Sequence, residues 1–301
     1  MHRIEGNRPE AFATIRQLEE IAPTASAYLV GLDALRLNRP QITIDTFSEV
    51  ETEMIHPYED SPHFFWFSVF ARAYHLLGEH GKELEKAREG LEHFPEDLVL
   101  KSREVEALAA LGEIEKVHNA IEESKAIDEP LRGSHGTVML RAAFELRAHG
   151  NREESLAIAE QAIEWYEVNE PENKSALANA LYRAERWDEA YTIYEELRQE
   201  EPDNIAYKGM TGVLAALMGD EEEARQVEET LRTIDREYLF GEHTYNRARI
   251  NALLGEREKA VSLIEEAFEQ GMPFVIVIHR DLALEPLQDY PPFQDLLEPE
   301  G

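Results

Sequence analysis

The stretch from Ala184 to Asn204, AERWDEAYTIYEELRQEEPDN, decides the fold. It opens with a turn around Glu185. The segment that follows contains the small Ala190 and the apolar Leu197, and Pro202 comes after it. Proline shortly after a helix ends it cleanly, so this stretch predicts a turn followed by one short helix. The same arrangement recurs along the chain.

Turn residues like Glu185 return at nearly constant spacing in both directions. The series from residue 78 onward has intervals of 34 to 38 residues, and two upstream members continue it. Its members are Gly6, Asn38, Gly78, Gly112, Gly150, Glu185, Gly219 and Gly255. A period near 34 residues indicates repeated helix–turn–helix units.

Small residues stand at fixed offsets from each turn. Seven residues before it stand Gly31, Ala71, Val105, Ala143, Ala178, Gly212 and Ala248. Five after it stand Ala11, Thr43, Glu83, Val117, Ser155, Ala190, Ala224 and Ala260. Two antiparallel helices can approach closely only where the facing side chains are small. Helices this short need stacking for stability, which predicts a solenoid.

At these residues the chain resembles the tetratricopeptide repeat family, most closely from Trp187 to Asn204. The resemblance implies an all-α, right-handed helix-turn-helix solenoid with about seven full repeats, a leading half-repeat and a C-terminal cap. Three residues depart from the pattern: Glu83 at a small position, and Glu104 and Arg247 at apolar ones. Residues 54–62 and 127–135 read as insertions.

Two regions are expected, a repeat solenoid over residues 1–270 and a capping segment over 271–301 that packs on the last repeat. The cap contains a short β-rich run at Phe274–Ile278 and a last short helix after Tyr290. The first unit is only half a repeat, which predicts that the chain is the C-terminal portion of a longer polypeptide. The alternative is that the solenoid simply begins with one helix, as capping units sometimes do.

Composition excludes several classes of function. There is no cysteine, which rules out disulfides, thiolate catalysis and cysteine-ligated zinc. The net charge of −32 disfavours nucleic acid as a partner, and no apolar stretch is long enough for a membrane span. We expect a cytoplasmic protein.

Motifs that would indicate catalysis are absent. His279-Arg280-Asp281-Leu282 spells the start of a kinase catalytic loop, but Pro286 stands where the loop needs asparagine. His75 and His80 are five residues apart across a turn, so they do not share a helix face as metal ligands would. We therefore expect no enzyme activity, no cofactor and no metal site.

The binding surface is expected on the concave side, which the first helix of each pair lines. At its exposed positions arginine outnumbers acid, although acid exceeds base about twofold over the chain (62 against 30). The candidate groove residues are Tyr28, Arg36, Arg72, His75, Phe144, Arg147, Asn179, Tyr182, Arg183, Tyr245 and Arg249. Arginine forks and rigid tyrosines suit an acidic or carboxylate-ended peptide, although each arginine could instead pair with glutamate on a neighbouring repeat.

Together these observations predict a protein-interaction scaffold or sensor module that binds a peptide or protein. The pattern from Phe65 to the Pro-Pro-Phe ending is similar to repeat regions C-terminal to bacterial serine/threonine kinases and transcriptional activators. That similarity implies the docking part of a larger bacterial signalling regulator. The alternatives are a stand-alone adaptor that self-associates through its N-terminal half-repeat, and a small-molecule sensor that controls a fused effector.

Overall fold

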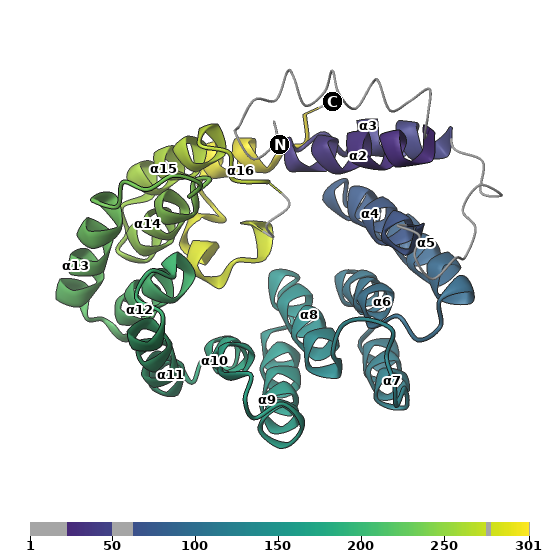
Figure 1. The fold of residues 1–301 in the computed structure, drawn as a ribbon, viewed down its shortest axis with the longest axis horizontal. Coiled ribbons are helices and arrows are strands. Elements are labelled where there is room, and N and C mark those ends of the chain that lie inside the picture. Colours follow the sequence, from purple (N-terminus) through teal and green to yellow (C-terminus); the bar gives the residue numbers. More distant parts are fainter. Residues whose placement is uncertain (1–22, 50–62, 275–277, 301) are drawn as a thin grey trace. The chain divides into compact units, whose positions relative to one another are not determined.

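The computed structural model describes residues 23–49, 63–274 and 278–300 (Figure 1). The predicted leading half-repeat, the first insertion and the centre of the apolar run near residue 276 lie outside the described residues. The chain divides into two compact units. Unit 1 comprises residues 1–149 with 299–301, and unit 2 comprises residues 150–298.

The described residues of unit 1 form three antiparallel helix pairs and one further helix (Figure 1). Its helices are α2 (Pro23–Arg36), α3 (Pro40–Ser48), α4 (His63–Leu76), α5 (His80–His93), α6 (Leu98–Ala110), α7 (Ile114–Lys125) and α8 (His135–Ala148). Each helix packs on the next along the chain, and α6 also packs on α4 and α8. The loop between α7 and α8 matches the insertion predicted at residues 127–135.

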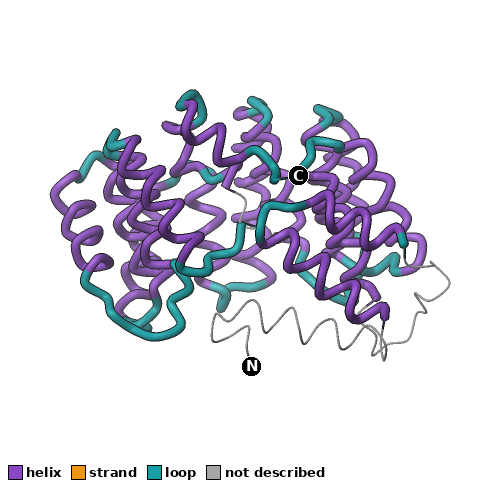
Figure 2. Tube along the Cα trace, turned by 90° about the horizontal axis from the view of Figure 1, so that it is seen from above, coloured by secondary structure: helices purple, strands orange, loops and turns teal. Residues whose placement is uncertain are grey.

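Unit 2 begins with one helix and continues with three pairs and a C-terminal segment. Its helices are α9 (Arg152–Asn169), α10 (Lys174–Arg183), α11 (Trp187–Glu200), α12 (Ile205–Met218), α13 (Glu221–Arg232), α14 (Glu242–Leu253) and α15 (Arg257–Glu269). Two 3-10 helices, η2 (Ile278–Arg280) and η3 (Leu282–Leu287), and the short α16 (Pro291–Leu297) follow. Figure 2 shows the described residues as helices joined by loops, which confirms the all-α, tetratricopeptide-like solenoid.

The predicted turn residues share one backbone conformation. All seven in the described chain have positive φ, between 55° and 82°. They are Asn38, Gly78, Gly112, Gly150, Glu185, Gly219 and Gly255. A residue in the left-handed region just after a helix turns the chain sharply, and glycine adopts that conformation without the strain that a Cβ brings.

The small residues lie where the paired helices meet. Ala71, Ala178 and Ala248, seven before their turns, are fully buried. A Cβ added at Gly212 of α12 would lie 2.7 Å from the Val227 side chain of the paired α13, which is closer than atoms can pack. The close approach of the paired helices therefore depends on the absence of larger side chains at these positions.

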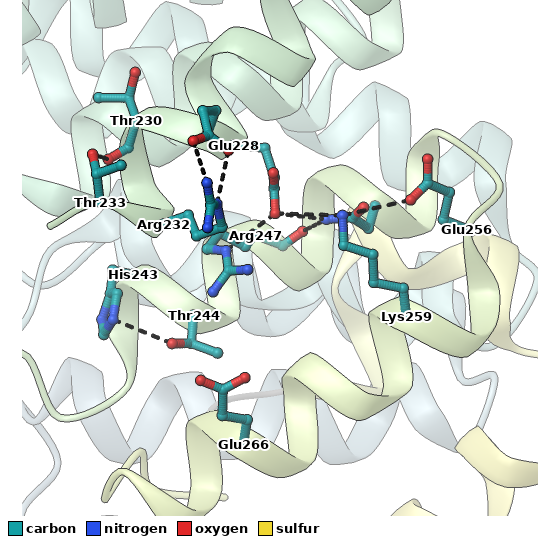
Figure 3. A network of polar contacts seen from close by, with 12 residues as sticks. Glu228, Thr230, Arg232, Thr233, His243, Thr244, Arg247, Glu256, Lys259 and Glu266 are labelled. Atoms are coloured by element: carbon teal, nitrogen blue, oxygen red, sulfur yellow. Dashed lines mark hydrogen bonds and ion pairs between the residues drawn. The ribbon is translucent and has the colours of Figure 1, made fainter.

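Charged residues at apolar or small positions are matched by ion pairs. Glu104 accepts hydrogen bonds from Arg88 (2.9 Å) and Lys101 (2.8 Å). In unit 2, the Arg247 Nε lies 3.1 Å from Glu228 Oε1, and Lys259 Nζ lies 3.6 Å from the same oxygen (Figure 3). These pairs explain how the repeat accommodates charge without losing its fold.

None of the described helices combines the length and hydrophobicity that a bilayer crossing requires.

Replacing Gly112 with alanine should lower the free energy of unfolding by about 1 kcal/mol, because alanine is strained at φ 71° although no atom lies within 4 Å of its Cβ. The matched control is Gly81→Ala in α5, which also has open space around the new Cβ but no positive φ. It should leave stability unchanged or raise it by up to about 1 kcal/mol. Urea unfolding followed by far-UV circular dichroism measures both; equal effects would contradict the turn argument.

Candidate functional site

Four polar side chains of unit 2 converge around one carboxylate, that of Asp281. Tyr182 and Arg183 end α10, Tyr245 and Arg249 lie four residues apart on α14, and Asp281 lies between η2 and η3. The Tyr245 hydroxyl donates to Asp281 Oδ2 over 2.9 Å, and Arg249 Nε lies 3.0 Å from the same oxygen. We name this group the carboxylate cluster.

The C-terminal segment is held in place by its own local structure. Asp281 is the N-cap of η3, since its Oδ1 accepts a hydrogen bond from the Ala283 backbone N–H over 3.0 Å. Leu284 and Leu287 of η3 are fully buried, and η3 packs against α14. One Asp281 oxygen thus caps the segment, while the other is left for the tyrosine and arginine of α14.

A second contact ties the segment to α10. The Arg183 guanidinium donates to the backbone carbonyl of Arg280 over 3.4 Å. Its carbon also lies 5.0 Å from the centroid of the Tyr182 ring, within cation–π range. The segment between η2 and η3 is therefore bound through both a side chain and a main-chain oxygen.

Burial sets the electrostatics of the carboxylate cluster. Burial alone would raise the pKa of Asp281, but the positive charges of Arg249 and Arg183, with the Tyr245 and Ala283 hydrogen bonds, bring it below its ordinary value. Burial would lower the pKa of Arg249, but the Asp281 charge outweighs it and raises that pKa. Burial raises the pKa of Tyr245, and the Asp281 charge adds to this effect. The pair is therefore ionised, and the tyrosine stays a neutral donor.

Arg249 is oriented by further contacts on its own side. Its Nη1 donates to Asn246 Oδ1 over 3.0 Å and lies 3.3 Å from the Met210 sulfur. Fixed donors that face one oxygen are suited to bind a carboxylate with little loss of side-chain entropy.

Of the eleven predicted groove residues, four meet in the carboxylate cluster: Tyr182, Arg183, Tyr245 and Arg249. Tyr182, Tyr245 and Arg249 are buried, and the last two contact Asp281 of the chain's own C-terminal segment. Asn179, one turn before Arg183, has a buried Oδ1 with no hydrogen-bond partner among the described residues. The partner of Arg249 is Asp281, so for this arginine pairing with glutamate on a neighbouring repeat is wrong.

The other predicted residues lie on unit 1. Tyr28 of α2 packs near Phe65 of α4, with ring centroids 6.4 Å apart, and Arg36 lies 3.8 Å from Asp33. Arg72 of α4, and Phe144 and Arg147 of α8, are half-buried. His75 is buried at the end of α4.

Two features escaped prediction. Asp281 lies inside the His279–Leu282 motif, which resembles the start of a kinase catalytic loop but has Pro286 where that loop needs asparagine. Folding of the chain brings Asp281 to α14. His75 and His80 are separated by a turn, yet both contact Glu83, because α5 folds back beside α4. The presence of Glu83 at a position that is small in other repeats is the signal that could have revealed this second cluster.

Replacing Asp281 with asparagine should destabilise unit 2 by about 3–5 kcal/mol, because the variant leaves Arg249 buried without its counter-charge. The matched control in the same segment is Asp289→Asn, whose ion pair with Arg257 is exposed and should matter by less than about 1 kcal/mol. Urea unfolding at neutral pH measures both.

The same substitution has a defined pH dependence. The folded-state pKa of Asp281 is lowered, so its contribution is complete above the ordinary aspartate pKa of about 3.9 and is lost as pH falls through the folded-state value. The difference in unfolding free energy between the wild-type chain and Asp281→Asn should therefore shrink below about pH 4. A difference that stays constant down to acid unfolding would contradict the ionised pair.

No family model matches the sequence, and no curated protein matches it. Among solved structures, a tetratricopeptide repeat protein from Parabacteroides merdae is similar with a TM-score of 0.46 and 15% identity, over 91% of this chain and 98% of that one. A thermophilic TPR protein from Thermus thermophilus has a TM-score of 0.40 and 20% identity, over 61% and 94%. The APC/C hetero-tetramer Cut9-Hcn1 gives 0.42 and 13%, over 90% and 50%. The helix pairs, left-handed turns and small packing positions of the described residues themselves constitute a tetratricopeptide-like fold.

Proposed function

We propose that this chain is a non-enzymatic interaction scaffold whose unit 2 recognises an acidic side chain or a C-terminal carboxylate of a peptide or protein partner. The observation that carries the proposal is the carboxylate cluster. Tyr245 and Arg249 already bind a carboxylate, that of Asp281, at positions where the repeat pattern predicts ligand contacts.

The chemistry of the cluster favours this ligand over others. It offers cationic and neutral hydrogen-bond donors, which suit an anion and are poorly suited to a cation. Buried tyrosines beside the arginines supply rigid apolar area for the rest of a peptide. Asn179 Oδ1 adds a buried acceptor one turn away on α10, which suits a peptide N–H.

The C-terminal segment has a place in this function. In the structure it binds to the cluster by a carboxylate and a main-chain carbonyl, the two groups that a peptide also offers. A partner that inserts its own acidic group would take the place of Asp281. Affinity for the partner is then reduced by the stability of the internal contact.

The proposal also includes a cellular context for the chain. The chain is the docking part of a bacterial regulator and acts in the cytoplasm. The support for this context is the sequence pattern alone.

The test is the binding of a fluorescent acidic peptide with a free C-terminal carboxylate, measured by polarisation against the same peptide with an amidated end. Charge reversal of Arg183 to glutamate should abolish binding, because Arg183 belongs to the carboxylate cluster. Arg186→Glu is the control, because Arg186 lies on α11's N-terminal side and pairs with Glu160 and Glu189, outside the cluster. Asp281→Ala, which removes the internal carboxylate, should tighten binding at least about tenfold.

Equal affinities for Arg183→Glu and Arg186→Glu would end the proposal. So would equal affinities for the free and amidated peptides together with no gain from Asp281→Ala. Circular dichroism of each variant establishes that the helices remain folded.

A further inference from the structure

A second polar cluster lies in unit 1, at the turn that joins α4 to α5. His75 is near the end of α4, His80 is the first residue of α5, and Glu83 lies in the first turn of α5. Because the two helices run antiparallel, these side chains meet across the turn. Each can offer one ligand atom, and the three atoms lie within 4.8 Å of one another. From this juxtaposition we propose that His75, His80 and Glu83 form a binding site for Zn²⁺ or a chemically similar divalent cation.

The distances agree with a shared ion. His75 Nδ1 lies 2.9 Å from Glu83 Oε2, and His80 Nδ1 lies 3.0 Å from the same oxygen. Ligands of tetrahedral zinc, with bonds of about 2.0–2.2 Å, lie about 3.3–3.5 Å from each other. A small outward shift of the side chains therefore accommodates the ion. Two imidazoles and one carboxylate form a three-ligand set that leaves the fourth position for water.

Burial makes a positive charge at this place necessary. The Glu83 side chain is 0% exposed, that of His75 is 7% exposed and that of His80 is 16% exposed. A buried carboxylate is stable only beside a compensating cation. In the part of the chain that the structure describes, the groups within ion-pair distance of Glu83 are these two histidines, which are cationic only when protonated. Neutral histidines with a divalent cation supply the charge equally well.

An outer carboxylate supports the same reading. The second ring nitrogen of His75, Nε2, lies 3.6 Å from Glu145 Oε1, and Glu145 of α8 is also fully buried. Histidines that bind metal through one nitrogen commonly direct the other toward a carboxylate, which fixes the ring. Glu145 is thus a positioning residue. Glu145 also contacts His149, whose Nε2 lies 3.1 Å from Oε1.

The repeat pattern provides an independent argument. Glu83 stands five residues after its turn, where the other described repeats have Thr43, Val117, Ser155, Ala190, Ala224 and Ala260. All of these are small or β-branched and buried, so helix packing at this position requires no carboxylate. A buried glutamate at this position costs stability unless it has a charged partner, which a metal ion supplies.

The experiment uses the full chain, without a polyhistidine tag and treated with chelator. Zn²⁺ is titrated by calorimetry, and Co²⁺ is added as a spectroscopic probe of tetrahedral nitrogen and oxygen ligands. The wild-type chain should bind Zn²⁺ and gain thermal stability from it. Glu83→Gln and His80→Gln should each lose at least about tenfold in affinity and lose the Co²⁺ absorption. Glu145→Gln should weaken binding about 10- to 100-fold while keeping the absorption.

The control is His93→Gln at the opposite end of α5, which removes an exposed histidine and should change nothing. Zinc binding that is equal in the wild-type chain, Glu83→Gln and His80→Gln would overturn the site, as would a wild-type chain that binds neither ion. In the latter case the cluster is an ion-pair network held by protons. The outcome is independent of peptide binding in unit 2, so each proposal can fail alone.

Discussion

The close approach of paired antiparallel helices is the constraint on which the rest of this structure depends. It requires side chains with little or no bulk at fixed distances from each turn, as the fully buried Ala71, Ala178 and Ala248 illustrate. It also requires a sharp reversal between the two helices, which the left-handed turn residues provide. Short helices gain their stability from this packing rather than from intrinsic propensity.

Some repeats have a charged residue at a small or apolar position. Such a side chain lies in the interior and needs a partner of opposite charge there. Glu104 is matched by Arg88 and Lys101, and Glu228 by Arg247 and Lys259 (Figure 3). These groups are ion pairs that neutralise one another. Glu83 differs, because its neighbours are histidines, whose charge depends on a proton or is replaced by that of a metal ion.

In the carboxylate cluster of unit 2, buried positive charge is compensated by an anion. Arginines and tyrosines on α10 and α14 create a buried, positive environment that demands an anion. The C-terminal segment supplies one in Asp281, whose lowered pKa reflects how strongly that environment favours the charged form. The proposed binding of a partner's carboxylate rests on this same environment.

The fold and the residue types of the predicted groove can be read from the sequence alone. Turn spacing and small-residue offsets depend on local backbone geometry and pairwise helix packing, both of which repeat along the chain and can be read from it. The positions of the seven described turns and of the buried small residues were accordingly correct. The predicted groove residues also include Tyr182 and Arg183 of α10, and Tyr245 and Arg249 of α14.

Which charges meet depends on the tertiary fold. Asp281 is 32 residues beyond Arg249, and His75 is separated from Glu83 by a turn, so neither contact belongs to one helix face. Such contacts depend on how a segment folds back, which residue types and spacing within a single helix do not encode. The physical reason is that helix periodicity relates residues three and four apart. A buried charge instead pairs with a residue of another helix, and distance and desolvation determine which one.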